Sequence, residues 1–337
     1  MYLRRFLSRR YGDRPVASEE LVTTCGATSG LQLVSTVLLE KNGIVFVEDP
    51  TYFISSSILA KDLGLKVVPV PMARDGIDIA ALEKAVLKEK EEVLCDGGRF
   101  WAMVYTIPNY HNPTGLTMSH EKGRALIELA TKNNMLVVCD DVYNLLSYSP
   151  HPFSRLRALQ QDPENCVISN GTFSKILAPG VRLGWIEASP TIVSRLAASG
   201  FLQSGGSMNN LTSGIATSLL SLGLLEAQLD HCKQVYGARM NTALRELEGL
   251  PEGWCVEPPG GGYFLWITAP QDLSAFCAQL EKNGVVVLPG SRASSSYPQP
   301  SYLFSSFRIS IAFFTEEKIA LACKTIVRLA CEVPPPT

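Results

Sequence analysis

A lysine in an apolar turn is the first candidate for chemistry. Lys175 belongs to the stretch NGTFSKILAPGVRLGW, residues 170–185. Burial disfavours the charged form of a lysine, so its amine becomes available as a nucleophile toward an aldehyde. The hydroxyl groups of Thr172 and Ser174 and the forked donors of Arg182 suit a phosphate group. In the alternative interpretation, Lys175 reaches solvent and Arg182 forms a surface ion pair.

Two adjacent carboxylates end another apolar run. Asp140 and Asp141 follow MLVVC directly, and Tyr143 is separated from Asp141 by a single residue. The pair could bind a divalent cation, but no further acidic or histidine ligand follows at a regular spacing. A single carboxylate is enough for a different task, because it raises the pKa of a heterocyclic nitrogen that it faces. Tyr143 could then reach a phenolic oxygen on the same ring.

Small residues open a predicted helix directly after the apolar run LVTT. The segment CGATSG, residues 25–30, leaves backbone N–H groups and hydroxyls free at the positive end of the helix dipole. Ala27 and Thr28 therefore suit a phosphate, although small residues also make an ordinary helix start. The segment has neither the GxGxxG spacing of a dinucleotide fold nor the GK[ST] of a P-loop, so the phosphate need not belong to NAD or ATP. Together these features match pyridoxal 5'-phosphate: an amine that can react with its aldehyde, a carboxylate that can face its ring nitrogen, and a site for its phosphate.

The elements around these residues predict a doubly wound α/β domain. Short apolar runs alternate with helical patterns, which is typical of parallel strands joined by right-handed crossovers. The carboxyl ends of parallel strands meet at one edge, so we expect the candidate residues to lie together there. Strands are predicted at 21–24, 44–48, 66–70, 101–106, 135–140, 166–170 and 184–188, and helices at 27–40, 52–62, 79–91 and 119–133.

A change of pattern after residue 190 predicts a second, smaller α+β domain. A long helical region through residue 248 is broken by QSGGSMNN. We place the large cofactor-binding domain at residues 1–215 and the small domain at 216–337. The small domain has predicted strands in WCVEP, GYFLWIT, VVVL and SFRISIAF, and predicted helices at 273–283 and 315–330.

Composition limits the class of partner. The chain has 337 residues, 46% of them hydrophobic, and a net charge of -2, so no strong field attracts nucleic acid or a membrane surface. Small polar molecules are the expected partners. The longest apolar stretch, residues 215–225, contains Thr, Ser and Gly and is too short to span a bilayer.

Cysteines and the first residues indicate the compartment. Cys139, Cys166 and Cys255 lie in apolar runs and are expected to be reduced thiols packed as small hydrophobic residues, which favours the cytoplasm. The opening MYLRRFLSRR predicts an amphipathic surface helix that buries Leu3, Phe6 and Leu7. Its four arginines also resemble a mitochondrial transit peptide, so the mitochondrion is the alternative.

Four ordered motifs resemble one enzyme family. NPTG at 112–115, DDVY at 140–143, GTFSKILAPGVRLGW at 171–185 and FRIS at 307–310 resemble the fold-type I, class I/II aminotransferases. Within that family, the likeness is to the branch of kynurenine/2-aminoadipate aminotransferases and the effector domains of MocR-type regulators. The resemblance implies a large, mostly parallel doubly wound domain with a smaller α+β domain. It also implies pyridoxal phosphate, transfer of an amino group from an L-amino acid to a 2-oxo acid, and a homodimer with active sites near the subunit interface.

The resemblance further implies a role for each candidate. Lys175 would form the Schiff base and carry a proton from the substrate, and Asp140 would pair with the pyridine nitrogen. Tyr52 would stack on the ring, unless it is only a buried tyrosine that begins a helix. Arg308 would bind the substrate α-carboxylate, the alternative being a surface arginine at a strand edge. Asn112 and Tyr143 would bind the phenolic oxygen, Asn112 would also contact substrate, and Ala27, Thr28, Thr172, Ser174 and Arg182 would bind the phosphate.

Family members carry several dozen residues before the point that matches the start of this chain, including an arm over the active site. We therefore expect cofactor binding to be better preserved than turnover. The alternatives are a lyase or decarboxylase on the same fold, and a catalytically impaired cofactor- or ligand-binding protein. Aromatic, 2-aminoadipate and branched aliphatic substrates all remain open, with side-chain choice expected from loops such as residues 291–301.

Overall fold

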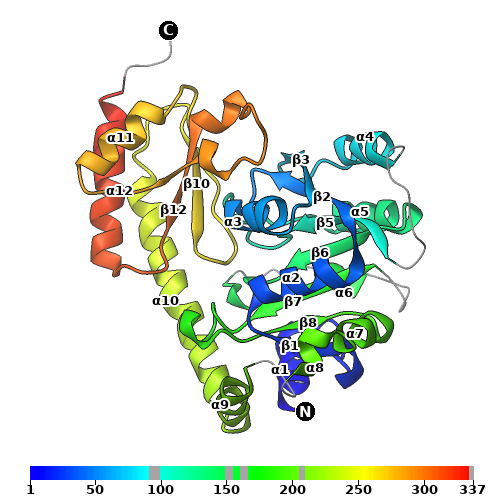
Figure 1. Cartoon of the computed structure of the whole chain (residues 1–337). Helices are drawn as coiled ribbons and strands as arrows, with labels where there is room; N and C mark the ends of the chain where they lie inside the picture. Colours follow the sequence, from blue (N-terminus) through cyan, green and yellow to red (C-terminus); the bar gives the residue numbers. More distant parts are fainter. Residues whose placement is uncertain (91–98, 149–154, 160–165, 205–208, 334–337) are drawn as a thin grey trace.

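Two separate β-sheets organise the computed structural model, which describes residues 1–90, 99–148, 155–159, 166–204 and 209–333 (Figure 1). The larger sheet has eight strands in the order β1-β8-β7-β6-β5-β2-β3-β4. All seven strands predicted in this part of the chain are present. The short strand β4 was not predicted. The bounds of the eight strands are β1 Leu21–Thr24, β2 Leu39–Asp49, β3 Lys66–Ala73, β4 Gly76–Ile77, β5 Phe100–Thr106, β6 Leu136–Asp140, β7 Val167–Thr172 and β8 Gly184–Glu187.

Strand direction departs from the prediction at β8. Strands β3, β2, β5, β6 and β7 run parallel to one another, as expected. Strand β8 is antiparallel to both of its neighbours, β7 and β1, so β1 has the same direction as β7. The cause is the short connection, residues 173–183, because a parallel crossover needs about a dozen residues or more. The chain therefore turns back at the carboxyl edge, and the turn holds Lys175 and Arg182 there.

Helices cover both faces of this sheet. Side chains of β2 and β5 alternate between two cores, with Val45 and Tyr105 in one core and Phe46 and Val104 in the other. The predicted helix at 52–62 is divided into α3 and a π-helical turn, Ile58–Asp62, and the predicted Glu91 end of α4 lies outside the described residues. The helices are α2 Ala27–Leu38, α3 Phe53–Ser57, α4 Ile79–Lys90, α5 His120–Lys132, α6 Leu156–Leu159 and α7 Pro190–Ala197, with 3-10 turns at Ser18–Glu20, Asn144–Leu146 and Pro179–Val181.

The second sheet belongs to the carboxyl-terminal part of the chain. Its four strands are antiparallel, in the order β11-β12-β10-β9, and α10, α11 and α12 lie beside it in Figure 1. The predicted boundary at 215 falls inside α9 and stays a prediction; residues 205–208 of QSGGSMNN lie outside the described part. The bounds are α8 Gly200–Gln203, α9 Asn210–Ser221, α10 Leu224–Leu247, β9 Cys255–Val256, β10 Phe264–Thr268, α11 Ser274–Lys282, β11 Leu288–Pro289, β12 Ser306–Ser310 and α12 Glu316–Cys331, with 3-10 turns at Gly290–Ala293 and Ser301–Ser305.

The first helix, α1 Tyr2–Tyr11, packs as an amphipathic helix. Phe6 and Leu7 are buried in the large core, and Leu3 packs against that core. None of the described helices is both long and apolar enough to cross a membrane. The thiols of Cys139 and Cys166 are buried as expected, but the prediction was wrong for Cys255, which is exposed because it lies on the two-residue edge strand β9.

A buried ion cluster attaches the segment after α1 to the large sheet. Arg155 is fully buried and donates to Asp13 Oδ2 at 2.7 Å and to Glu187 Oε2 at 2.6 Å. Its guanidinium carbon lies 3.7 Å from the centroid of the Tyr11 ring. Arg157, also buried, donates to Glu20 at 2.9 Å. These pairs compensate charges that burial would otherwise make costly.

Arg155→Ala is expected to destabilise the chain by about 3 to 5 kcal/mol, because buried Glu187 loses its hydrogen-bonded cation and keeps only the more distant Arg14, at 3.6 Å, among the described residues. The measurement is the free energy of unfolding in urea. Arg328→Ala is the control, since Arg328 forms an exposed pair with Glu332 at 3.1 Å and should cost at most about 1 kcal/mol. Equal effects of the two substitutions would contradict the role given to the buried cluster.

Candidate active site

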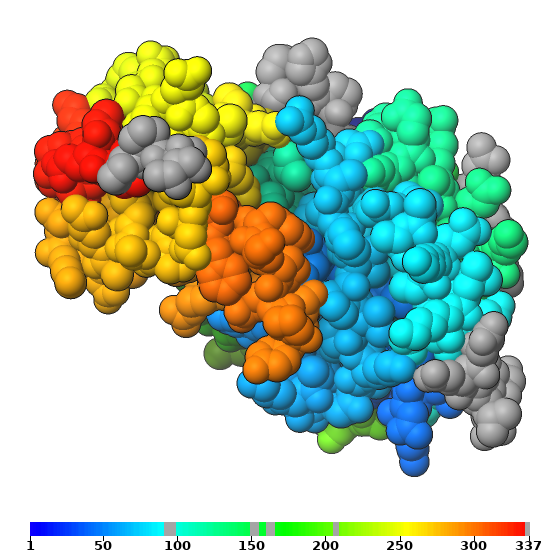
Figure 2. Space-filling view, turned by 90° about the horizontal axis from the view of Figure 1, so that it is seen from above, coloured from blue at the N-terminus to red at the C-terminus, as the bar shows by residue number. Residues whose placement is uncertain are grey.

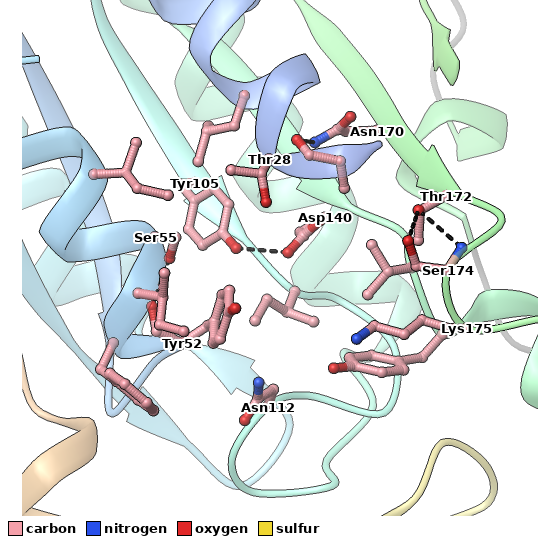
Figure 3. A pocket seen from close by; sticks show the side chains of 18 of the residues that line it. Thr28, Tyr52, Ser55, Tyr105, Asn112, Asp140, Asn170, Thr172, Ser174 and Lys175 are labelled. Carbon is pink, nitrogen blue, oxygen red and sulfur yellow. Dashed lines mark hydrogen bonds between the residues drawn. The ribbon is translucent and has the colours of Figure 1, made fainter. Parts of the chain in front are cut away.

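A cavity of ≈ 320 Å³ opens at the carboxyl edge of the large sheet and reaches the second sheet. All eleven residues singled out from the sequence line it, although their individual roles remain predictions. Figure 3 shows Thr28, Tyr52, Asn112, Asp140 and Lys175 arranged around one common space. The predicted set is Ala27, Thr28, Tyr52, Asn112, Asp140, Tyr143, Thr172, Ser174, Lys175, Arg182 and Arg308.

One end of the cavity is suited to an anion. Helix α2 begins at Ala27 with no side-chain cap, so the first N–H groups of the helix are free for a ligand. Gly26 precedes it with φ of 90°, and a Cβ there would lie 3.0 Å from Arg182 Nη2. Only glycine accommodates this conformation together with so close an arginine.

Arg182 completes this end of the cavity, which we call the anion cup: Ala27, Thr28, Thr172, Ser174 and Arg182. Arg182 Nη1 donates to Ser174 Oγ at 3.2 Å, and Thr172 Oγ1 donates to Ser174 Oγ at 3.0 Å. Arg182 has left-handed backbone, φ of 46°, which is uncommon for a side chain with a Cβ. No ion pair of Arg182 occurs among the described residues. Because Arg182 also lines the cavity, its charge is available to an anion bound in the cup.

Lys175 lies beside the anion cup. Its side chain is half-buried rather than fully enclosed. Lys175 Nζ lies 5.9 Å from the centroid of the Tyr263 ring, and within the described residues it forms no ion pair. The amine is thus directed into the cavity (Figure 3).

Asp140 forms the floor of the cavity. Its carboxylate is buried; Oδ2 accepts a hydrogen bond from Tyr105 at 2.7 Å, while Oδ1 has no partner among the described residues. Burial raises the pKa of Asp140 to about 6, although the Tyr105 hydrogen bond and the charge of Lys175 act in the opposite direction. A buried acceptor without a partner is costly, so this oxygen is suited to a protonated ligand atom.

Asp141 has a different environment from its neighbour. It accepts a hydrogen bond from Ser169 at 2.5 Å and lies behind the cavity rather than in its lining. Burial raises the pKa of Asp141 to about 6, and the charge of Arg155 opposes this shift. Only one of the two adjacent carboxylates is thus available to a ligand.

Arg308 faces the cavity from β12 of the second sheet. Its Nη1 donates to Asn112 Oδ1 at 2.6 Å, and its guanidinium carbon lies 4.1 Å from the Phe264 ring centroid. Arg308 Nε is buried without a partner in the described part of the chain, and burial lowers the pKa of Arg308. A mostly buried guanidinium without a carboxylate partner is suited to bind one from a ligand.

Aromatic rings enclose the space between these polar groups. Tyr143 is buried, with its ring centroid 5.2 Å from that of Tyr263 in an edge-to-face arrangement. Burial raises the pKa of both Tyr143 and Tyr52, so both phenols are neutral donors at physiological pH. Tyr52 is half-buried and projects into the cavity (Figure 3).

Two buried polar residues of the site were missed by the sequence analysis. Tyr105 holds Asp140, and Asn170 Nδ2 donates to the Ala27 carbonyl at 2.8 Å, which joins β7 to the first turn of α2. Both residues stand at or next to the carboxyl end of an apolar strand. That position was the available signal, but it was applied only to the segments that follow the strand ends and to the carboxylates, not to these two residues.

Comparison with known proteins identifies the class. The profile of the family described as aminotransferase class I and II matches residues 3–326. The chain therefore belongs to the class I and II aminotransferases, with the fold-type I architecture predicted from its motifs. Pyridoxal phosphate is the cofactor of this class.

Individual relatives support the same branch. The chain is 31% identical to aromatic-amino-acid aminotransferase 1 of Thermococcus litoralis over 328 residues. This alignment covers 96% of this chain and 75% of that protein. It is 31% identical over 280 residues to YisV, an HTH-type transcriptional regulator of Bacillus subtilis, covering 82% of this chain and 54% of the regulator. The crystal structure of Pyrococcus horikoshii kynurenine aminotransferase in complex with PMP matches with a TM-score of 0.83 at 29% identity, covering 98% of this chain and 79% of that one. The predicted likeness to kynurenine aminotransferases and to regulators is confirmed.

The residues of the cavity fit pyridoxal phosphate. The free Asp140 Oδ1 suits a protonated ring nitrogen, and the anion cup suits a phosphate with two negative charges. Lys175 Nζ is a free amine within the same cavity. Each polar group of the cofactor thus has a counterpart.

The raised pKa of Asp140 generates a pH-dependent prediction for the chain without cofactor. A carboxyl whose pKa is higher in the folded state than in the unfolded state stabilises the fold when it is protonated. For Asp140 this stabilisation is complete below about pH 4, the unfolded-state pKa, and is lost as the pH rises through about 6, the folded-state pKa. Asp140→Asn should therefore stabilise the cofactor-free chain at pH 8, by on the order of 2 to 3 kcal/mol, and have little effect near pH 4. Urea unfolding at several pH values measures this difference.

Asp75→Asn is the matched control. Asp75 is exposed, and the hydrogen bond from Lys122 lowers its pKa, so the carboxylate stabilises the fold above pH 4 and loses this contribution in acid. At pH 8, Asp140→Asn should thus raise the free energy of unfolding, whereas Asp75→Asn should lower it. A destabilising effect of Asp140→Asn at pH 8 without cofactor would contradict the burial argument.

Proposed function

We propose that this chain transfers the amino group of L-amino acids with apolar or aromatic side chains to a 2-oxo acid. The observation that carries this proposal is that one cavity holds three groups ready for a ligand. Among the described residues, the Lys175 amine and the Arg308 guanidinium form no ion pair, and the buried Asp140 Oδ1 has no hydrogen-bond partner. Lys175 and Asp140 suit pyridoxal phosphate, and Arg308 suits the α-carboxylate shared by all amino acids.

The anion cup is proposed to bind the phosphate, and Asp140 to hold the pyridine nitrogen in its protonated form. Asn112 and Tyr143 both line the cavity and are proposed to bind the phenolic oxygen. Tyr52 is proposed to stack on the ring. When bound, pyridoxal phosphate supplies an aldehyde that captures amines and a ring that accepts electrons.

Lys175 and Arg308 are proposed to act on the substrate itself. Arg308 orients the substrate through two parallel hydrogen bonds to its carboxylate, which places the Cα–H bond toward Lys175. At rest Lys175 Nζ would hold the cofactor aldehyde; once the substrate amine has replaced it there, the released Lys175 amine would take the proton from Cα and return it to the other reacting carbon. The aromatic walls reduce the access of water to this exchange.

The apolar wall supports the proposed substrate class. In the described lining, the cations are Lys175, Arg182 and Arg308, and each already has a proposed partner. A second carboxylate on a substrate side chain would therefore meet apolar surface, which is unfavourable. The relative from Thermococcus litoralis is named an aromatic-amino-acid aminotransferase, which agrees with this proposal. The apolar lining consists of Leu31, Phe53, Ile54, Ile58, Ile107, Val142 and Phe264.

Two substitutions test the proposal. Lys175→Ala should abolish the visible absorbance change that amino acids produce in the cofactor-loaded protein and lower kcat by at least about 10³-fold, because both anchor and proton carrier are lost.

Arg308→Gln should keep the cofactor absorbance and lower kcat/KM for phenylalanine by about 10²-fold, since one charged pair is lost. The readouts are absorbance titration and steady-state kinetics.

Omission of the 2-oxo acid distinguishes the alternative reactions. A transaminase stops after a single turnover without it, whereas a lyase or decarboxylase continues. Continued turnover without a 2-oxo acid, or normal turnover by Lys175→Ala, would contradict the proposal.

We also propose that two copies of the chain associate, as the family resemblance implies. Helices α8 and α9 and the start of α10 expose apolar side chains whose burial would favour association. Light scattering should give about twice the mass of 36.7 kDa, and the mass of a single chain at micromolar concentration would contradict this. A cytoplasmic location, with the mitochondrion as the alternative, stays a prediction. The exposed side chains are Phe201, Leu211, Ile215, Leu222 and Leu224.

A further inference from the structure

A buried carboxylate outside the cavity connects the two sheets. Asp49 ends β2 and is 2% exposed. It accepts hydrogen bonds from Ser296 Oγ at 2.6 Å, Ser295 N at 3.0 Å and Ser294 Oγ at 3.1 Å. No cation pairs with Asp49 in the described part of the chain, so these serines compensate its burial.

The serines belong to residues 291–301, which we call the serine loop. This loop lies beyond α11 and β11, whereas Asp49 belongs to the large sheet about 245 positions earlier. Tyr302, next to the loop, donates from its hydroxyl to the Asp49 carbonyl at 3.0 Å. In Figure 2 the orange surface of this part of the chain lies directly against the blue surface of the large sheet.

The serine loop also binds the segment that follows Asp49. Thr51 N donates to the Ala293 carbonyl at 2.9 Å, and the Ser295 and Ser56 hydroxyls form a hydrogen bond of 2.7 Å. Residues 52–58 follow the first attachment and include the second, and Tyr52, Phe53, Ile54, Ser55 and Ile58 among them line the cavity. We call residues 52–58 the pocket wall.

The serine loop itself does not reach the cavity. In the described lining, no residue between 291 and 301 is present. The loop was expected from the sequence to influence the choice of substrate side chain. Its contacts provide a route for that influence, because it holds the pocket wall from behind.

The pocket wall also lies next to the floor of the cavity. Ser55 Oγ donates to the Tyr52 carbonyl at 2.6 Å within the wall, and Tyr105, which donates to Asp140, lines the same cavity. Ser55 and Tyr105 point toward the same region in Figure 3. Movement of the wall would therefore change the shape of the substrate space.

We propose that Asp49 and the three serines 294–296 form a latch that fixes the pocket wall and thereby determines which substrate side chains the site accepts. Asp49 is a positioning residue, because it touches neither the cavity nor its ligands. The substrate part of this proposal rests on the proposed function. The mechanical part, that the serine hydroxyls hold the wall, does not.

Ser296→Ala tests the latch, because it removes the shortest hydrogen bond to Asp49 while changing little volume. Ser296→Thr keeps the hydroxyl and should rescue the effect. Ser301→Ala is the matched control, since it removes an exposed hydroxyl from the same loop. Asp49→Asn is the stronger variant, and unfolding in urea shows whether it folds.

Hydrogen–deuterium exchange of the full chain without added cofactor is the first readout. Backbone amides of residues 51–58 should exchange about fivefold faster in Ser296→Ala and at the original rate in Ser296→Thr and Ser301→Ala. Unchanged exchange in both Ser296→Ala and a folded Asp49→Asn would overturn the latch.

Substrate choice is the second readout. In Ser296→Ala the ratio of kcat/KM for phenylalanine to that for alanine should fall by about fivefold, with cofactor affinity within about twofold of the original chain. An unchanged ratio together with faster exchange would overturn the specificity part. If the original chain neither binds pyridoxal phosphate nor transaminates, the proposed function fails, and the exchange experiment alone decides the latch.

Discussion

The site depends on one constraint, the common direction of six strands in the large sheet. Strands β1, β3, β2, β5, β6 and β7 all end at the same edge, so polar side chains that follow them are brought together without any local sequence relationship. Asp140 is placed by β6, Asp49 by β2 and the Lys175 turn by β7. The antiparallel β8 adds to this arrangement, because its short connection keeps Arg182 at the edge.

Charge is distributed unequally around this edge. The cavity holds three cations, Lys175, Arg182 and Arg308, and a single carboxylate, which matches a ligand set rich in anionic oxygens. The neighbouring carboxylates Asp141 and Asp49 are buried too, but each is satisfied by serine donors. Asp140 differs because it lines the cavity, whereas Asp141 and Asp49 are not part of the described lining, and its partnerless Oδ1 is therefore the one that a ligand can reach.

Sequence reasoning was strongest for residues whose chemistry is unusual for their position. A charge at the end of an apolar strand, as at Asp140, or alone within one, as at Arg308, is costly to bury and therefore informative. Tyr105 and Asn170 were missed because a tyrosine or asparagine at a strand end is common, and only the pairing of β5 with β6 and of β7 with α2 shows what they contact. The antiparallel direction of β8 follows from the short connection between β7 and β8, residues 173–183, which is shorter than a parallel crossover needs, and the sequence prediction did not use this length. The contacts of Asp49 could not be predicted, since the serines lie in a different sheet region and about 245 positions away.

The most direct test of the account is to locate the amine that binds the cofactor aldehyde. The chain is incubated with pyridoxal phosphate, reduced with borohydride and digested, and the peptides are analysed by mass spectrometry. The account predicts a stable pyridoxyl group on the peptide containing Lys175, at about one group per chain, and its loss when inorganic phosphate competes for the anion cup. Labelling of other lysines at similar levels, or no label at Lys175, would contradict the assignment of this cavity as the active site.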